Sequence, residues 1–152
     1  MKLSSFVAAD RMVLELTASG RSEVLEKLTA PLLALDIVTD AAQFIDDLVR
    51  REDQISTVME NGVAIPHARS HAVRRLSLVV GIAGEEGIGF DTDSGLLSQL
   101  FFCIAIPSFA PTSHISLLQT LARFARDANR VEKILKSKTP AIASKYLSSF
   151  KG

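Results

Sequence analysis

The sequence predicts an α/β fold in which a β-sheet is covered on both faces by helices. Residues 76–83 (LSLVVGIA) and 100–107 (LFFCIAIP) are apolar at nearly every position, as in interior strands. Segments with helical spacing lie before, between and after the predicted strands, which is the order of an α/β sandwich. The chain has 152 residues, of which 47% are hydrophobic, so we expect a single domain over residues 1–152.

Residues 12–16 (MVLEL) alternate weakly between apolar and polar side chains and predict a first strand. Residues 21–35 repeat apolar side chains at helical spacing, with Ser19 or Ser22 as a candidate N-cap. Pro31 lies inside this pattern. Because proline removes a helical donor, we expect it to kink or split the helix.

A second helix is predicted after Thr39 or Asp40, with an apolar face that ends near residues 50–52. The short apolar run 63–65 then leads into Pro66, which favours an extended or turn conformation for the residue before it.

The C-terminal half contains further elements around the second apolar strand. Residues 88–90 predict a short strand between glycine-rich turns. Ser113 is the expected cap of a strongly amphipathic helix over 115–125, and two shorter helices are predicted around 131–135 and 141–150.

Composition argues against several functional classes. The 17 basic and 17 acidic residues balance, whereas a nucleic-acid-binding protein presents a clustered positive surface. The single cysteine, Cys103, excludes an intrachain disulfide and predicts a buried structural thiol. The N-terminal residues lack the apolar stretch of a signal peptide, and no apolar run is long enough to span a membrane. We therefore expect a soluble, cytoplasmic protein that neither binds nucleic acid nor inserts into a membrane.

Two of the three histidines lie at predicted junctions between turns and regular elements. His67 ends the stretch NGVAIPH, and His114 follows Ser113 at the start of a helix. A neutral imidazole nitrogen can act as a nucleophile, and a second imidazole can hold or balance a transferred group. From the residues alone, a histidine that only bonds the backbone at a turn is an equally good interpretation.

Other site chemistries have weaker support. The spacing of His67 and His71 suits zinc on one helix face, but no further ligand follows at a suitable distance. The sequence has no G-x-S-x-G elbow, no P-loop and no G-x-G-x-x-G after a strand. These observations disfavour a metal site, a serine hydrolase and a nucleotide-binding enzyme.

Three segments carry a resemblance to a known family: the pair Arg51-Glu52, the stretch NGVAIPH at 61–67, and the later SHISLLQTLARFA. Together they resemble the enzyme IIA domain of the fructose/mannitol type in the phosphoenolpyruvate-dependent sugar phosphotransferase system (PTS), including its nitrogen-regulatory branch. The resemblance runs from about Met12 to the end of the chain. It implies a mixed β-sheet sandwiched between helices, and an activity that requires no cofactor.

The resemblance also implies roles for individual residues. His67 is expected to be the phosphorylated nucleophile, with the phosphoryl group on Nε2, and His114 the auxiliary histidine beside it. Arg51 matches the family's active-site arginine, whose guanidinium can donate two charge-assisted hydrogen bonds to phosphoryl oxygens. Asn61 and Gly62 are expected to shape the turn that presents His67.

The sequence departs from the family pattern in the same region. Val58 and Glu60 stand where the family usually has glycine, and Ala68 replaces the usual glycine after the histidine. We expect a stiffer and more acidic loop. A carboxylate near His67 repels an incoming phosphoryl group unless Glu60 points outward.

The implied activity is that of a phosphotransferase. The expected phosphoryl donor is HPr or the nitrogen-branch phosphocarrier. The phosphoryl group is then expected either to pass to an enzyme IIB or to act as a signal to regulatory target proteins. The nitrogen-related branch is favoured because no IIB or membrane IIC segment is fused. The alternatives are a regulatory binding module with little onward transfer and a degenerate domain without transfer. Residues 88–90 and Phe109 are expected to form an apolar rim that contacts the partner.

Overall fold

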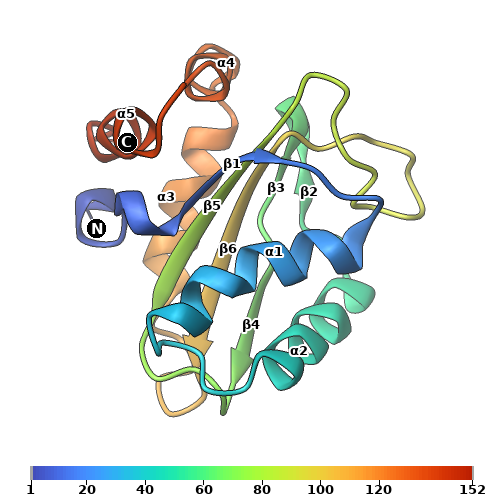
Figure 1. Cartoon of the computed structure of the whole chain (residues 1–152), viewed down its shortest axis with the longest axis vertical. Helices are drawn as coiled ribbons and strands as arrows, with labels where there is room; N and C mark the ends of the chain where they lie inside the picture. Colours follow the sequence, from blue (N-terminus) through green and yellow to red (C-terminus); the bar gives the residue numbers. More distant parts are fainter. Residues whose placement is uncertain (1, 152) are drawn as a thin grey trace.

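A mixed six-stranded sheet lies between two layers of helices in the computed structural model, which describes residues 2–151 (Figure 1). The strands are β1 (Met12–Leu16), β2 (Val58–Met59), β3 (Val63–Ala64), β4 (His67–Ser70), β5 (Ser77–Ala83) and β6 (Leu100–Pro107). Their order is β1-β5-β6-β3-β2, and β4 pairs with β6 further along the same edge as β3. The β5–β6 and β2–β3 pairs are antiparallel, and the other pairs are parallel. The predicted fold class is confirmed.

The helices divide between the two faces of the sheet. Helices α1 (Arg21–Ala34) and α2 (Ala41–Gln54) cover the near face in Figure 1, and α3 (Ile115–Ala125) packs on the opposite face with α4 (Ala128–Leu135) and α5 (Pro140–Ser148) beside it. Short 3-10 turns occur at Leu3–Ser5, Ala9–Arg11 and Glu60–Gly62.

The two central strands, β5 and β6, are buried along their whole length because both of their faces are covered. Side chains of β6 alternate between the two layers: Phe101 and Cys103 pack with α1 and α2, whereas Phe102 and Ile104 pack with α3. The Cys103 thiol is fully buried, as predicted, and burial raises its pKa to about 12.

Helix α1 is continuous through Pro31, so the predicted split is wrong. The proline lies in the last turn, where the missing donor disturbs little of the helix, and its carbonyl accepts a hydrogen bond from the Leu35 N–H. Neither serine is the N-cap. Gly20 occupies that position, the N–H and hydroxyl of Ser19 donate to the Glu23 carboxylate, and Ser22 lies within the helix.

Helix α2 begins as predicted, with the Asp40 carboxylate accepting a hydrogen bond from the Gln43 N–H. It ends at Gln54, later than predicted, which places Arg51 inside its last turn. Helix α4 begins at Ala128, earlier than predicted, because Asp127 caps it through two backbone N–H groups.

Three expectations for the second half of the chain are wrong. Residues 88–90 form no strand, and Ile88 makes only an isolated bridge to Ser98. Phe90 is fully buried, because it packs against Phe101, so this segment is no rim for a partner. Ser113 is not a helix cap: its hydroxyl donates to the Ala110 carbonyl, and His114 occupies the N-cap position of α3.

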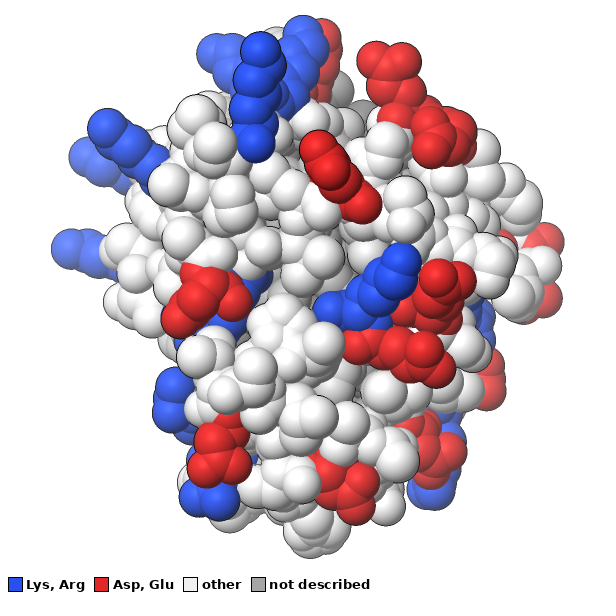
Figure 2. Space-filling model, in the orientation of Figure 1, with Lys and Arg blue, Asp and Glu red and all other residues white. Residues whose placement is uncertain are grey.

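The surface carries both signs of charge, and Figure 2 shows acidic and basic side chains interspersed over the face that includes α1 and α2. Within residues 2–151, no helix combines the length and the apolar character required to cross a membrane.

Candidate functional site

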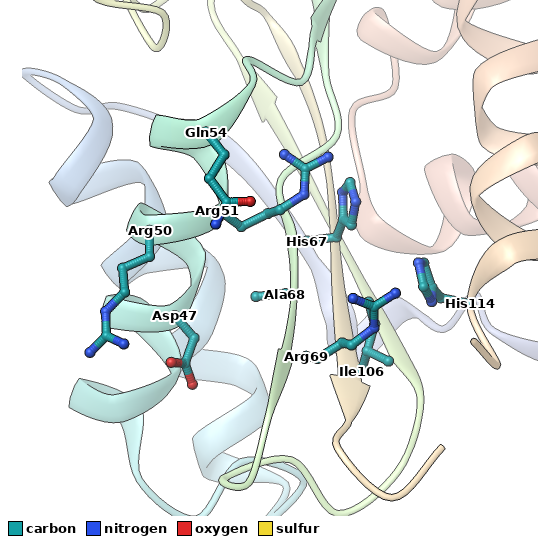
Figure 3. A pocket seen from close by; sticks show the side chains of 9 residues that line it. All are labelled: Asp47, Arg50, Arg51, Gln54, His67, Ala68, Arg69, Ile106 and His114. Atoms are coloured by element: carbon teal, nitrogen blue, oxygen red, sulfur yellow. The ribbon is translucent and has the colours of Figure 1, made fainter. Parts of the chain in front are cut away.

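A cavity of about 390 Å³ lies where α2, β4 and the start of α3 meet (Figure 3). It brings together Arg51, His67 and His114, three residues that the sequence analysis singled out from distant segments. The full lining is Asp47, Arg50, Arg51, Gln54, His67, Ala68, Arg69, Ile106 and His114.

His67 owes its position to an interruption between β3 and β4. Both strands run parallel to β6, but Ile65 and Pro66 separate them, and His67 is the first residue of β4. His67 pairs with Ile104 of β6, whose side chain lies on the α3 face of the sheet. The histidine therefore projects toward α3 from the rim of the sheet, with only 8% of its surface exposed.

The imidazole of His67 is held in one tautomer by the backbone. Its Nδ1 lies 2.8 Å from the Ile65 carbonyl oxygen, and because a carbonyl only accepts hydrogen bonds, Nδ1 carries the proton. Nε2 of the neutral ring then keeps its lone pair. Burial lowers the pKa of His67 below its ordinary 6.5; the bond to Ile65 opposes this, and the charges of Arg51 and Arg69 add to it.

His114 lies against the first histidine. The two ring centroids are 5.7 Å apart, and the planes are inclined by 33°. His114 is 5% exposed, and its Nδ1 is buried with no hydrogen-bond partner among the described residues. Burial lowers its pKa, as do His67, Arg69 and Arg51. Two neutral rings therefore face one another at neutral pH.

Arg51 approaches from the other side of the sheet rim, in the last turn of α2. Its Nη1 donates to the Ile55 carbonyl oxygen at 3.0 Å, which fixes the guanidinium next to the cavity. The neighbouring Glu52 is buried, and its carboxylate accepts hydrogen bonds from the Thr57 N–H (2.6 Å) and hydroxyl (2.8 Å). Glu52 thus holds residues 55–57 in place, and this segment contains the Ile55 carbonyl that Arg51 binds.

Arg69 is one of the cavity residues that the sequence did not predict. It lies two residues after His67 on β4, and its Nε donates to the Pro111 carbonyl oxygen at 2.6 Å. The available signal was the two-residue spacing from His67, which puts both side chains on one face of a strand. That signal was unreadable because HARS was not recognised as a strand.

Asn61 and Gly62 lie in the connection between β2 and β3, both with left-handed φ angles, 63° and 69°. The Asn61 side-chain amide donates to the Ala125 carbonyl oxygen at the end of α3, at 2.8 Å. Glu60 is exposed and is not among the residues that line the cavity.

His71 lies outside the cavity, where it is exposed and its Nδ1 shares a hydrogen bond with the Ser108 hydroxyl at 2.9 Å. No group of three or more His, Cys, Asp or Glu side chains within residues 2–151 is arranged to hold a metal ion.

The chemistry of the cavity is that of an anion site with a nucleophile. A neutral histidine presents a lone pair to a space bordered by arginine side chains, and the arrangement suits a ligand with several negatively charged oxygens. A phosphoryl group has this character.

Comparison with known proteins gives related sequences that differ in length. The chain is 28% identical over 141 residues to the PTS system 2-O-alpha-mannosyl-D-glycerate-specific EIIABC component of Escherichia coli, covering 92% of this chain but only 21% of that protein. It is 30% identical over 124 residues to a nitrogen regulatory protein of Pseudomonas aeruginosa, covering 80% of this chain and 79% of that one.

Solved structures share the fold. Nitrogen regulatory protein IIA-Ntr from Neisseria meningitidis has a TM-score of 0.79 at 22% identity, covering 95% of this chain and 98% of that one. Enzyme IIA mannitol from Escherichia coli, solved in complex with phosphorylated enzyme IIB mannitol, has a TM-score of 0.76 at 18% identity, with coverages of 95% and 98%.

The family model for the phosphoenolpyruvate-dependent sugar phosphotransferase system, EIIA 2, matches residues 5–150. This match covers almost the whole sequence, and it agrees with the fold and with the resemblance carried by the stretch around His67. The chain therefore belongs to the EIIA 2 family of the phosphoenolpyruvate-dependent sugar phosphotransferase system.

Proposed function

We propose that this chain, acting as a single IIA domain, is a phosphoryl carrier that accepts a phosphoryl group on Nε2 of His67. The donor is HPr or the nitrogen-branch phosphocarrier. The observation that carries the proposal is the bond between His67 Nδ1 and the Ile65 carbonyl, because it keeps Nε2 unprotonated and directs it away from the backbone.

The transfer exchanges one phosphorus–nitrogen bond for another. The Nε2 lone pair of His67 attacks phosphorus while the bond to the donor histidine breaks, and the donor nitrogen leaves with the electron pair. The proton stays on Nδ1 throughout and is donated in the hydrogen bond to the Ile65 carbonyl oxygen, which stabilises the positive ring of the phosphorylated histidine. Since phosphoryl transfer relies on alignment and charge stabilisation, a fixed ring supplies much of what the reaction needs.

The roles that we propose for the other site residues follow from where each one lies relative to His67. Arg51 binds phosphoryl oxygens from the α2 side, and each charge-assisted hydrogen bond contributes about 1.5–3 kcal/mol before screening by water. His114 donates to the phosphoryl group from the N-terminus of α3 as the auxiliary residue. Asn61 and Gly62 hold the connection before β3 and so support the turn that leads to His67.

Onward transfer has two candidate routes. A relative of this fold is known in complex with phosphorylated enzyme IIB, which supports an enzyme IIB as acceptor. We favour the nitrogen-regulatory branch, in which the phosphoryl group is a signal to target proteins. The support is the 30% identity over 124 residues to a nitrogen regulatory protein of Pseudomonas aeruginosa, together with the fold shared with IIA-Ntr from Neisseria meningitidis.

The test is phosphorylation of the purified protein with phosphoenolpyruvate, enzyme I and either phosphocarrier. We expect an acid-labile, alkali-stable phosphoryl group that is absent in His67→Ala and present in the control His71→Ala, whose ring lies outside the cavity. His114→Ala should retain the site but accept more slowly. If the wild type takes no label from either donor, the carrier function is refuted and a phosphorylation-independent binding module remains.

A further inference from the structure

Arg69 adds a positive charge to the cavity at a position that the family resemblance did not identify. It projects from the same face of β4 as His67, because the two residues are two positions apart on a strand. In Figure 3 its guanidinium group points toward the space between the two histidine rings, whereas Arg51 extends toward His67 from α2.

The guanidinium of Arg69 is held in place by one nitrogen and leaves the others available. Nε is occupied by the Pro111 carbonyl oxygen at 2.6 Å, and a guanidinium has four further N–H groups on its two terminal nitrogens. Within the described chain, those nitrogens have no carboxylate partner. Arg50, which also lines the cavity, differs because its charge is paired with Asp46.

This arrangement matches the requirements of a phosphoryl group. A phosphoryl group on Nε2 of His67 carries two negative charges and three oxygen acceptors, which need donors from more than one side. Arg51 offers donors from the helix, and Arg69 offers a fork of donors from the strand.

We propose that Arg69 is an additional phosphoryl-binding residue, whose terminal nitrogens bind the phosphoryl group on His67 and stabilise the phosphorylated form. This role for Arg69 rests on the proposed carrier function. A second arginine without a carboxylate partner shifts the exchange equilibrium toward phosphorylated His67 and away from the phosphorylated donor. Because Arg69 is exposed, water screens the interaction, and we expect an effect of roughly tenfold on the equilibrium, about that of one charge-assisted hydrogen bond.

A competing role is purely structural. Pro111 precedes α3 by a few residues, so the bond from Arg69 also connects β4 to the loop that leads into His114. In that case Arg69 acts through His114, and its removal has no further effect once His114 is replaced.

The experiment compares Arg69→Gln with Arg75→Gln, which removes the same charge from an exposed arginine outside the cavity. The first measurement is the equilibrium constant for phosphoryl exchange with the HPr-type phosphocarrier, in the wild-type and His114→Gln backgrounds. The second is the dissociation constant of inorganic phosphate, followed by the nitrogen shifts of the His67 ring in the unphosphorylated protein. Backbone amide spectra establish that each variant is folded.

We expect Arg69→Gln to move the exchange equilibrium roughly tenfold toward the phosphocarrier in both backgrounds and to weaken phosphate binding, while Arg75→Gln changes either by less than about twofold. Equal behaviour of the two variants overturns the inference and leaves the carrier function intact. An effect that disappears in the His114→Gln background also overturns it, in favour of a positioning role. If the wild type accepts no phosphoryl group, the carrier function fails, and phosphate binding alone decides whether Arg69 serves an anion site.

Discussion

Replacing Glu52 with glutamine tests how the segment after α2 is held. The side chain is 3% exposed, and its two oxygens receive the N–H of Thr57 at 2.6 Å and its hydroxyl at 2.8 Å. A glutamine can keep its amide oxygen on the Thr57 N–H and donate its NH₂ group to the Thr57 hydroxyl, but both hydrogen bonds lose the charge that strengthens them. A charge-assisted bond is worth about 1 kcal/mol more than a neutral one, so the free energy of unfolding should fall by about 2 kcal/mol. For a chain of this length, the melting temperature should fall by roughly 4–8 °C.

The assay is urea and thermal unfolding followed by circular dichroism at pH 7. Thr57→Val is the companion variant: it removes the hydroxyl but keeps the N–H, and should cost about 1 kcal/mol. The double variant should show a coupling of at least about 0.5 kcal/mol, because both changes act on one hydrogen bond. Phosphoryl acceptance should also slow in Glu52→Gln, since the Ile55 carbonyl that orients Arg51 lies in the same segment. A Glu52→Gln protein as stable as the wild type, or strictly additive variants, refutes the reasoning.

Three further outcomes follow from the structure. Because burial lowers the pKa of His67, the rate of phosphoryl acceptance should fall to half only below pH 6.5, and a half-loss above pH 6.5 contradicts this. The same shift makes the folded state lose stability as the pH falls from 6.5 through the lowered pKa. Gly81→Ala should destabilise by about 1–3 kcal/mol in urea titrations, because its new Cβ lies 2.7 Å from the Leu28 side chain, whereas Gly89→Ala, with open space, should not. Asn61→Ala should lower the free energy of unfolding by about 1–2 kcal/mol, because alanine is strained at the left-handed φ of this position. Asn61→Gly should lower it less, because glycine is not strained there, and equal losses in the two variants contradict backbone strain as the cause.

Much of the fold was predictable because the strongest patterns in the sequence are those of the layers. The continuous apolar runs of β5 and β6 require cover on both faces, and the spacing in α2 and α3 supplies that cover. The family resemblance, carried by Arg51-Glu52, NGVAIPH and SHISLLQTLARFA, then identified two histidines and an arginine that the structure brings to one cavity.

The failures have physical causes in short or context-dependent elements. β4 is four residues long with a charged third position, so it lacks a periodic signal, and Arg69 was overlooked with it. Phe90 was taken for a surface residue because burial of a loop aromatic depends on its contact with Phe101 from a distant strand. Ser113 has the chemistry of a helix cap, but its hydroxyl bonds within the preceding turn instead.

The carbonyl that orients the nucleophile belongs to the main chain. An apolar residue of similar size at position 65 presents the same oxygen to His67, so such a change of side chain leaves the tautomer as it is. Substitutions of Arg51 or Arg69 change the pKa of His67, but its tautomer depends on the position of the backbone between β3 and β4. The proposed acceptor nitrogen of His67 therefore keeps its lone pair when a side chain in the cavity wall is replaced and the backbone stays in place.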